Sequence, residues 1–362
     1  MRSKRGNMPD TEENPFLKPS SLPHEAVMFS DIEAEHFLPA VRRGIAEAVK
    51  NIEAIKNNPD APMFENTIAA LEFSQDDLTR VTNVLRIMSG VCHSNELETA
   101  GLTVEEEMSS HENAVMTDQA LFRRVKAVYD ARDKLSLDRE QKTLLCDTYM
   151  KFVDAGALLD AVSQADLHGT DKDIAALMAV FQNNVTKSLG EYKKVIDDEK
   201  YLAGVPDRAK DVYKAAAEKE NLQGKWLITL SPPPHDIFAH CENRALRKEL
   251  YEAFYTVASK GQYDNRKVLL DLARLRHHRA QLLGYDNYAE AAFAQKNRMV
   301  KDPAAAMKFL KETERVYKAV AEENLQQVRA LAKKQDGLTA VEAWDMAYYN
   351  RQLQEQLFNA DM

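Results

Sequence analysis

Hydrophobic residues recur at helical spacing along most of the chain. Between residues 30 and 58 they fall every three or four positions, the period of one helix face. Ser30 or Asp31 is suited to cap the start of this segment, and Pro59 follows its end. The pattern predicts a long amphipathic helix, which Pro39 either begins or kinks. Its apolar stripe consists of Ile32, Phe37, Leu38, Val41, Ile45, Val49, Ile52 and Ile55.

The same periodicity predicts helices over most of the remaining sequence. Within the first of these segments, Ser74 is expected to restart the helix. Gly337 and Thr339 are expected to end one helix and begin the last. The predicted segments are 64–93, 95–117, 118–135, 138–159, 170–197, 236–261, 264–284 and 302–335, followed by a terminal helix whose stripe starts with Trp344, Ala347, Tyr348 and Leu353.

One stretch breaks the helical pattern. Residues 225–234, KWLITLSPPP, are bulky or β-branched and are bounded by Gly224 and three prolines. They predict a short strand. Residues 200–206, KYLAGVP, are the expected partner, which gives a small hairpin in a helical body.

Composition strengthens the helical prediction and narrows the function classes. The 362 residues include only 12 glycines and 12 prolines, so an all-α protein is expected. The net charge of −9 disfavours nucleic-acid binding. Residues 1–30 form a predicted N-terminal arm, floppy over 1–14, and 31–362 a helical body with a possible seam near 200–235.

The arm lacks the apolar core of a secretory signal, and no segment approaches the roughly 20 apolar residues of a membrane span. Three widely separated cysteines, Cys92, Cys146 and Cys241, suit reduced thiols. A cytoplasmic protein without a membrane partner is therefore expected.

Hydrolysis by a zinc ion on a helix typically uses H-E-x-x-H, which places two imidazoles on one helix face and supplies a general base. The segments HEAVM at His24 and HENAV at His111 lack the second histidine. Neither therefore closes a zinc site alone.

The remaining histidines also make poor zinc ligands. His277 and His278 are adjacent, so they point about 100° apart on a helix and lie among arginines. His235, His240 and Cys241 have unfavourable spacing and lack a fourth ligand. The sequence thus assigns no metal ligand.

Other catalytic signatures are missing as well. The sequence has no G-x-S-x-G turn and no phosphate-binding glycine loop. The basic runs FRRVK (122–126) and ENRALRKELYEAF (242–254) are interpreted as solvated helix faces. The sequence assigns no catalytic residue, and substrate-binding residues remain unknown.

Several distinctive segments follow one another along nearly the whole chain. They are NPFL (14–17), IEAEHFLPAV (32–41), NPDAPMFENTIAALEFSQDDLTRV (58–81), KWLITLSPPP with ENRALRKELYEAF (225–254), LARLRHHRAQLLGYDNYAEAAFAQKNRMVKDPAAAMKFL (272–310) and AWDMAYY (343–349). In this order they together resemble the thimet oligopeptidase, oligopeptidase A and peptidyl-dipeptidase family of zinc metallopeptidases. NPFL and AWDMAYY favour the peptidyl-dipeptidase branch.

The resemblance implies an almost wholly helical fold that forms one wall of a deep channel for short peptides. In the family, the W-D-x-x-Y-Y helix leads into a second part that carries the H-E-x-x-H zinc ligands. The chain therefore resembles the N-terminal half of such an enzyme without its catalytic zinc part. This half alone is expected to bind no stoichiometric zinc and to hydrolyse no peptide, and its terminal helix to be less stable than its body.

Two other interpretations stay open. One is a catalytically inactive homologue that acts as a peptide- or protein-binding helical module. The other is a generic helical scaffold whose resemblance is only architectural, although the ordered series of segments argues against it.

Overall fold

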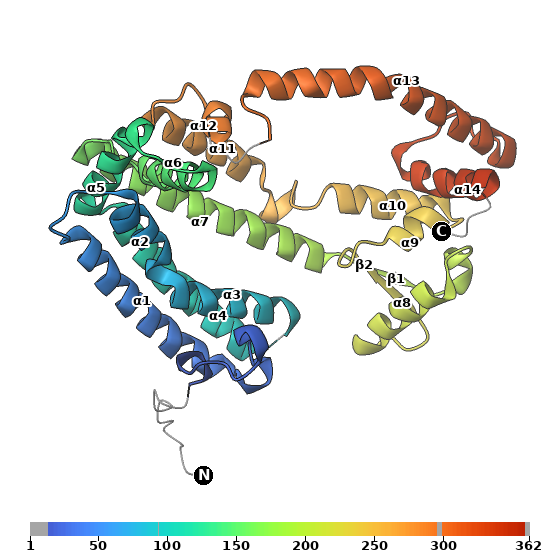
Figure 1. Ribbon diagram of the computed structural model, residues 1–362. Helices are drawn as coiled ribbons and strands as arrows, with labels where there is room; N and C mark the ends of the chain where they lie inside the picture. The colour runs from blue at the N-terminus through green and yellow to red at the C-terminus, as the bar shows by residue number, and fades with distance from the viewer. Residues whose placement is uncertain (1–13, 93, 295–298, 359–362) are drawn as a thin grey trace, which may run out of the picture. The chain divides into compact units, whose positions relative to one another are not determined.

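A computed structural model describes residues 14–92, 94–294 and 299–358 (Figure 1). The predicted all-α class with a small strand pair is confirmed: within these ranges, helices make up nearly all the regular structure, and two short strands pair. None of the described helices combines the length and the apolar character that crossing a membrane requires.

The chain divides into two compact units, Met1–Ala165 and Asp166–Met362. The seam predicted near 200–235 stays a prediction, and the floppy part of the predicted arm lies almost wholly outside the described residues. The long helix α7, Ala161–Glu191, crosses the division.

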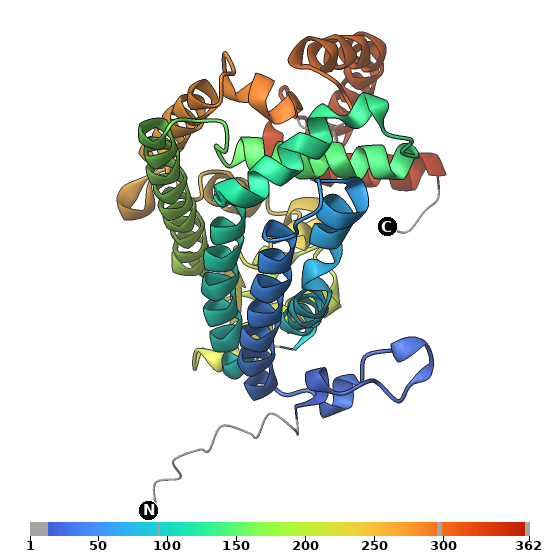
Figure 2. The ribbon, with the colours of Figure 1, turned by 60° about the vertical axis from the view of Figure 1, so that its left-hand side comes forward.

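Unit 1 is a set of antiparallel and crossing helices with two apolar clusters. Helices α1, α3 and α4 run side by side and share one cluster, which includes Phe37, Val41 and Leu78 (Figure 2). The other cluster joins the end of α1 to α5 and α6 around Leu121 and Phe152. The helices are α1 (Ala34–Lys56), α2 (Ala70–Glu72), α3 (Asp76–Val91), α4 (Asn95–Met116), α5 (Gln119–Asp130) and α6 (Arg139–Asp154), with a π-helical turn at Phe64–Ala69.

A small residue lets the first two long helices of unit 1 approach closely. At Gly44 in α1, an added Cβ would lie 3.1 Å from the backbone Cα of Leu78 in α3. A larger side chain there would force the helices apart, because a backbone atom cannot move aside as a flexible side chain can.

Unit 2 carries the strand pair and the remaining helices. Strand β1, Lys193–Ile196, pairs antiparallel with β2, Trp226–Thr229, and α8 packs on β2. An apolar cluster under this pair includes Ile228, Ile237 and Leu250. The helices are α8 (Asp207–Lys219), α9 (His235–His240), α10 (Arg244–Tyr255), α11 (Arg266–Leu282), α12 (Tyr288–Ala294), α13 (Pro303–Asp336) and α14 (Met346–Phe358).

Polar contacts join α7 to α11 within this unit. Arg279 Nε lies 2.6 Å from Asp171 Oδ1. Asn265, at the start of α11, donates through its side-chain nitrogen to the carbonyl oxygen of Phe181 at 3.0 Å and is buried. The two helices are therefore fastened at several points along their lengths.

Several local predictions were wrong. The helix predicted over 236–261 is two helices, α9 (His235–His240) and α10 (Arg244–Tyr255), because the chain is extended at Cys241 and Asn243. The first helix begins at Ala34 after Glu33, because residues 29–31 form a separate 3₁₀ turn. The strand at 226–229 pairs with 193–196 rather than with 200–206, where residues 199–202 form a 3₁₀ turn. The helix predicted over 170–197 starts at Ala161 and stops at Glu191, because the next β-branched positions enter the sheet.

The breaks expected around α13 and Ser74 are only partly as predicted. Gly337 ends α13 with φ of 67°, a left-handed conformation that favours glycine. Thr339 does not start the next helix, which begins with a 3₁₀ turn at Ala343–Asp345. Ser74 lies in a 3₁₀ turn directly before α3, as a helix restart requires.

Candidate functional site

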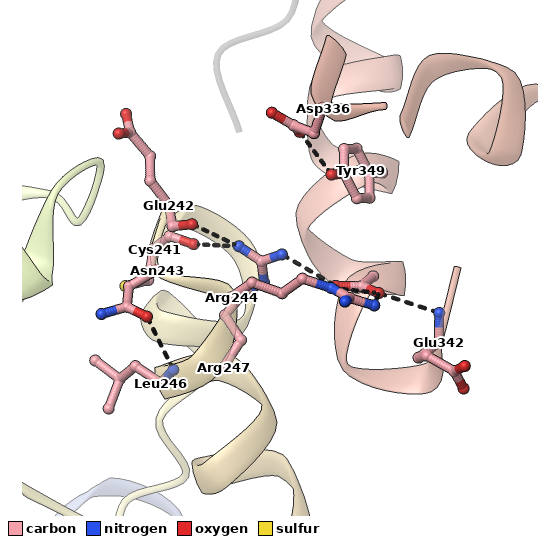
Figure 3. Close-up of polar contacts among 10 residues, drawn as sticks. Cys241, Glu242, Asn243, Arg244, Leu246, Arg247, Asp336, Glu342 and Tyr349 are labelled. Atoms are coloured by element: carbon pink, nitrogen blue, oxygen red, sulfur yellow. Dashed lines mark hydrogen bonds and ion pairs between the residues drawn. The ribbon is translucent and has the colours of Figure 1, made fainter. Parts of the chain in front are cut away.

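The structure brings two distant segments of unit 2 together around one buried carboxylate. Asp345, in the 3₁₀ turn before α14, is 0 % exposed. Arg244 at the start of α10 meets it with two near-parallel bonds, Nε to Oδ1 at 2.9 Å and Nη2 to Oδ2 at 2.7 Å. Arg247, one turn later, donates Nη2 to Oδ1 at 3.0 Å (Figure 3). The family segments 242–254 and 343–349 are thus joined by an ion cluster.

The entry into α10 positions these arginines. Asn243 caps the helix, since its side-chain oxygen accepts from the N–H of Leu246 at 3.2 Å. Arg247 donates Nη1 to the carbonyl oxygen of Cys241 at 2.7 Å and to that of Glu242 at 3.2 Å. Its guanidinium therefore binds the loop before α10 as well as the carboxylate, as Figure 3 shows.

The charges of the cluster are strongly coupled. Burial raises the pKa of Asp345, but hydrogen bonds from Arg244, the Glu342 N–H and Arg247 outweigh it and hold that pKa below its ordinary value. The same pairing raises the pKa of Arg244. Two cations thus share one buried anion, and removing that anion leaves Arg247 charged and desolvated.

Further contacts seat α14 on its neighbours. Tyr349 is 1 % exposed, and its hydroxyl donates to Asp336 Oδ2 at 2.6 Å. Burial and this bond raise the pKa of Tyr349. The Arg247 guanidinium lies 4.1 Å from the ring centroid of Tyr348, and Arg351 donates Nε to the carbonyl oxygen of Ala239 at 2.8 Å. The terminal helix is therefore tied to α9, α10 and α13.

The arrangement suits positioning rather than proton transfer. Asp345 accepts bonds at both oxygens from guanidinium and backbone donors, and a lowered pKa keeps it ionised. A general acid or base needs a pKa near the working pH and access to the reacting atom, and Asp345 has neither. The cluster is best described as a clamp, which we call the Asp345 clamp (Arg244, Arg247 and Asp345).

Interpreting 242–254 as a solvated helix face was wrong for Arg247, which is 1 % exposed. The Arg244 side chain stays 42% exposed while it pairs with the buried Asp345. Arg247 lies close in sequence to Leu246 and Leu250, which are buried, but a sequence without a visible partner gives no reason to bury a charge. The partner lies about a hundred residues further on, in the W-D pair of AWDMAYY.

The histidines considered as ligands lie apart from one another. His111 is buried, with Nε2 3.1 Å from Gln75 Oε1, and burial lowers its pKa. His278 pairs with Asp166 at 3.0 Å beside the exposed His277. His24 is exposed in a turn.

The residues after the proline run likewise form no ligand set. His235 and His240 bound α9, and the Cys241 thiol contacts the carbonyl oxygen of Tyr201 at 3.3 Å. Burial raises the pKa of Cys241. Across the described ranges, no three His, Cys, Asp or Glu side chains gather as a zinc ion requires, so these residues do not fit the metal.

Comparison with known proteins agrees with the motif series. Peptidase family M3 matches residues 237–362, which include the whole Asp345 clamp. The chain is 33% identical to dipeptidyl carboxypeptidase of Escherichia coli over 353 residues, 97% of this chain and 52% of that protein. It is 30% identical to oligopeptidase A of the same organism over 96% of this chain and 51% of that protein.

The likeness extends to a plant relative. The organellar oligopeptidase A of Arabidopsis thaliana is 25% identical over 96% of this chain and 44% of that protein. The chain belongs to the thimet oligopeptidase, oligopeptidase A and peptidyl-dipeptidase family, the M3 peptidases, as its motifs predicted. It spans about half the length of the curated relatives it matches.

Proposed function

We propose that this chain is the N-terminal helical portion of a zinc-dependent peptidyl-dipeptidase or oligopeptidase that acts on short peptides in the cytoplasm. The observation that carries the proposal is the 33% identity to dipeptidyl carboxypeptidase across 97% of the chain. The role of the chain is to form part of the wall of the substrate channel. Zinc and the catalytic groups belong to another part of the polypeptide, since the described residues hold no fitting ligand set.

Exposed apolar residues on α13 support the proposal that another part of the polypeptide packs against this helix. Near its end, Val328 and Ala332 are buried against Tyr349. Earlier in the helix, positions of the same heptad-like stripe are more than half exposed. Exposed apolar stripes of this length mark interfaces. The exposed members are Met307 (52%), Leu310 (57%), Tyr317 (64%) and Val320 (52%).

The Asp345 clamp has a natural role in this proposal. It holds the turn that leads into α14 against the start of α10, at the point where the family's W-D-x-x-Y-Y segment lies. A buried, charge-assisted network specifies a single geometry more sharply than apolar contacts do. We propose that the clamp orients α14 for the catalytic part.

The test is to tag the gene in its native source and purify the polypeptide. We expect a mass about twice 41.0 kDa, one zinc per polypeptide, and chelator-sensitive release of C-terminal dipeptides or of internal fragments from short peptides. Which products form decides between peptidyl-dipeptidase and oligopeptidase. The 362-residue chain alone, stripped with chelator and reloaded, is expected to retain no stoichiometric zinc and to show no hydrolysis.

The competing function gives a different result. A native polypeptide of 41.0 kDa that binds peptides without cleaving them would identify an inactive peptide-binding homologue. One tightly held zinc in the short chain would contradict both alternatives.

A further inference from the structure

The second half of α14 is fastened to the end of α9 by one arginine. Arg351 donates Nε to the carbonyl oxygen of Ala239 at 2.8 Å, and its Nη1 pairs with Glu355 one turn further along α14. Ala239 and His240 are the last two residues of α9. We call the contact made by Arg351, Glu355 and the Ala239 carbonyl the Arg351 latch. It is separate from the Asp345 clamp, which holds the turn before α14.

A titratable side chain lies directly beside the latch. His240 follows Ala239 and is partly buried, and the polar contacts found among the described residues include none from its imidazole. The imidazole is faced by two cations and two anions from three elements. They are Asp236 on α9 itself, Arg351 and Glu355 on α14, and Arg208 on α8. A change of charge on His240 near neutral pH is therefore felt by the latch.

Burial keeps this imidazole neutral. Burial lowers the pKa of His240 below its ordinary value of 6.5, and Arg351 and Arg208 lower it further, against the opposing charges of Asp236 and Glu355. Between the folded pKa and 6.5, the unfolded chain binds a proton that the folded chain excludes. The stability linked to His240 is therefore complete above pH 6.5 and decreases as the pH falls to the folded pKa.

The end of α9 has little room to move away from an added charge. The backbone of the preceding loop is so close that a Cβ added to Gly204 would lie 2.4 Å from the carbonyl oxygen of His240. The last turn of α14 is less constrained, since Leu357 and Phe358 are 59% and 73% exposed. Repulsion between His240 and Arg351 is therefore relieved by movement of α14, the less stable of the two elements.

We propose that His240 is a proton switch for the Arg351 latch. When the imidazole gains a proton in mildly acidic solution, it repels the Arg351 guanidinium, and the second half of α14 loosens from α9. The turn before α14 stays in place, because the Asp345 carboxylate remains ionised over the same pH range. The helix thus has two attachments, of which only the latch responds to pH near neutrality.

The proposal goes beyond the proposed function, since it needs neither zinc nor a peptide. It concerns two helices of the 362-residue chain itself. A native polypeptide that proves to be an inactive homologue leaves the switch untouched. An α14 that ignores pH leaves the peptidase proposal untouched.

The experiment follows hydrogen exchange by mass spectrometry in the whole chain between pH 7.5 and 5.5, with rates corrected for the intrinsic effect of pH on amide exchange. We expect protection over residues 349–358 to fall about threefold, the size of effect expected for a partly exposed pair of charges. Protection over residues 342–346, the turn held by the Asp345 clamp, should stay the same.

Two variants on α9 test the assignment to His240. His240→Gln keeps a polar side chain that does not titrate, so it should abolish the pH-dependent loss of protection. The matched control is His235→Gln at the exposed start of the same helix. It should retain the loss, because His235 lies at the opposite end of α9 from the latch.

A direct titration covers the case in which His240→Gln fails to fold. The imidazole resonances of the unaltered chain, assigned through their bonds to the backbone, are followed by NMR over the same pH range. We expect the pKa of His240 to lie below 6.5. Arg351→Gln should raise this pKa, because it removes a cation that faces the imidazole.

Four results would overturn the proposal. They are protection of α14 that does not change with pH, a loss that persists in His240→Gln, a His240 pKa at or above 6.5, and an equal loss over residues 342–346. The last would show that the whole terminal segment responds to pH and that the latch is not a separate attachment.

Discussion

The helices of unit 1 and the terminal helix of unit 2 are held in place by different forces. Unit 1 packs around two extended apolar clusters, with residues such as Leu121 and Phe152 fully buried. Among the described residues, the cluster that seats α14 has four buried members, Val328, Leu331, Ala332 and Tyr349. Beside it lies the Asp345 clamp. Where little apolar surface is available, fixed charges supply the specificity of the contact.

The contrast has an energetic consequence. Apolar packing tolerates volume-conserving changes, because its contribution is spread over many contacts. A buried ion cluster is worth little more than an apolar replacement while intact, but it becomes strongly unfavourable when one partner is removed. Single polar substitutions should therefore matter most at the clamp, and cavity-forming substitutions most in unit 1.

The largest effect is expected from Asp345→Asn. The amide keeps the shape but leaves the Arg247 guanidinium, 1 % exposed, without its counter-charge. We expect a loss of about 3–5 kcal/mol in the stability of the α10–α14 contact. Hydrogen exchange by mass spectrometry over residues 343–358 measures it, and residues 64–90 should be unaffected.

A matched control for this change is Asp133→Asn in unit 1. Asp133 is 87% exposed at its side chain and lies 3.9 Å from Arg132, so we expect a change within about 0.5 kcal/mol. If Asp345→Asn is equally silent, the clamp does not hold α14 and the comparison between the units fails.

The next effect is expected in the apolar core of unit 1. Leu121→Ala removes a side chain that is 0% exposed in the cluster of α5 and α6. The cavity should cost about 2–5 kcal/mol, measured by urea unfolding, with exchange over 343–358 unchanged. Leu102→Ala, at a position 66% exposed, should cost much less. Equal losses would show that burial does not determine stability in this unit.

The same comparison shows which features of the fold can be predicted from the sequence. The stripe through Phe37, Val41 and Ile52 predicted both the helix α1 and its buried face, because apolar periodicity is a local signal. The strand at 226–229 was recognised from its bulky residues and the prolines after it. The partner strand of 226–229 was not predicted, because strand pairing depends on which distant segment lies alongside it in the tertiary structure.

The clamp lay beyond sequence reasoning for the same reason. Arg247 and Asp345 were both present in segments recognised as family motifs, yet nothing local shows that they meet. Two charges become a buried pair only when the fold brings both out of water together.

A smaller effect is expected from Tyr349→Phe. This change keeps the buried ring but removes the hydroxyl that donates to Asp336, and a bond to a charged acceptor contributes about 1.5–3 kcal/mol. Even without the substitution, exchange over 343–358 should be faster than over 64–90, because Leu357 and Phe358 are exposed. The variant should widen this difference. Tyr317→Phe, at a position 64% exposed, is the control and should leave exchange unchanged.

The smallest effect concerns the pH dependence of unit 1. His240 in unit 2 also has a pKa that burial lowers, so the test follows hydrogen exchange in α4 alone. His111 in unit 1 has a lowered pKa, because burial disfavours its charged form more than the neighbouring Glu112 favours it. Below pH 6.5, the ordinary pKa of histidine, the unfolded chain binds a proton that the folded chain does not. The stability of unit 1 therefore decreases as the pH is lowered from 6.5 to the folded pKa of His111. The pKa of the Asp345 carboxyl is also lowered, but it acts at more acidic pH. Its contribution to stability is present above the ordinary pKa of 3.8 and is lost as the pH falls through the folded pKa.

Urea unfolding and hydrogen exchange over residues 95–116, both measured between pH 7.5 and 5.5, should show the loss of stability caused by His111. His111→Gln should abolish it, whereas His277→Gln, an exposed position, should retain it. If the loss of stability persists in His111→Gln, another group causes the pH dependence of unit 1, and His111 does not distinguish the two units.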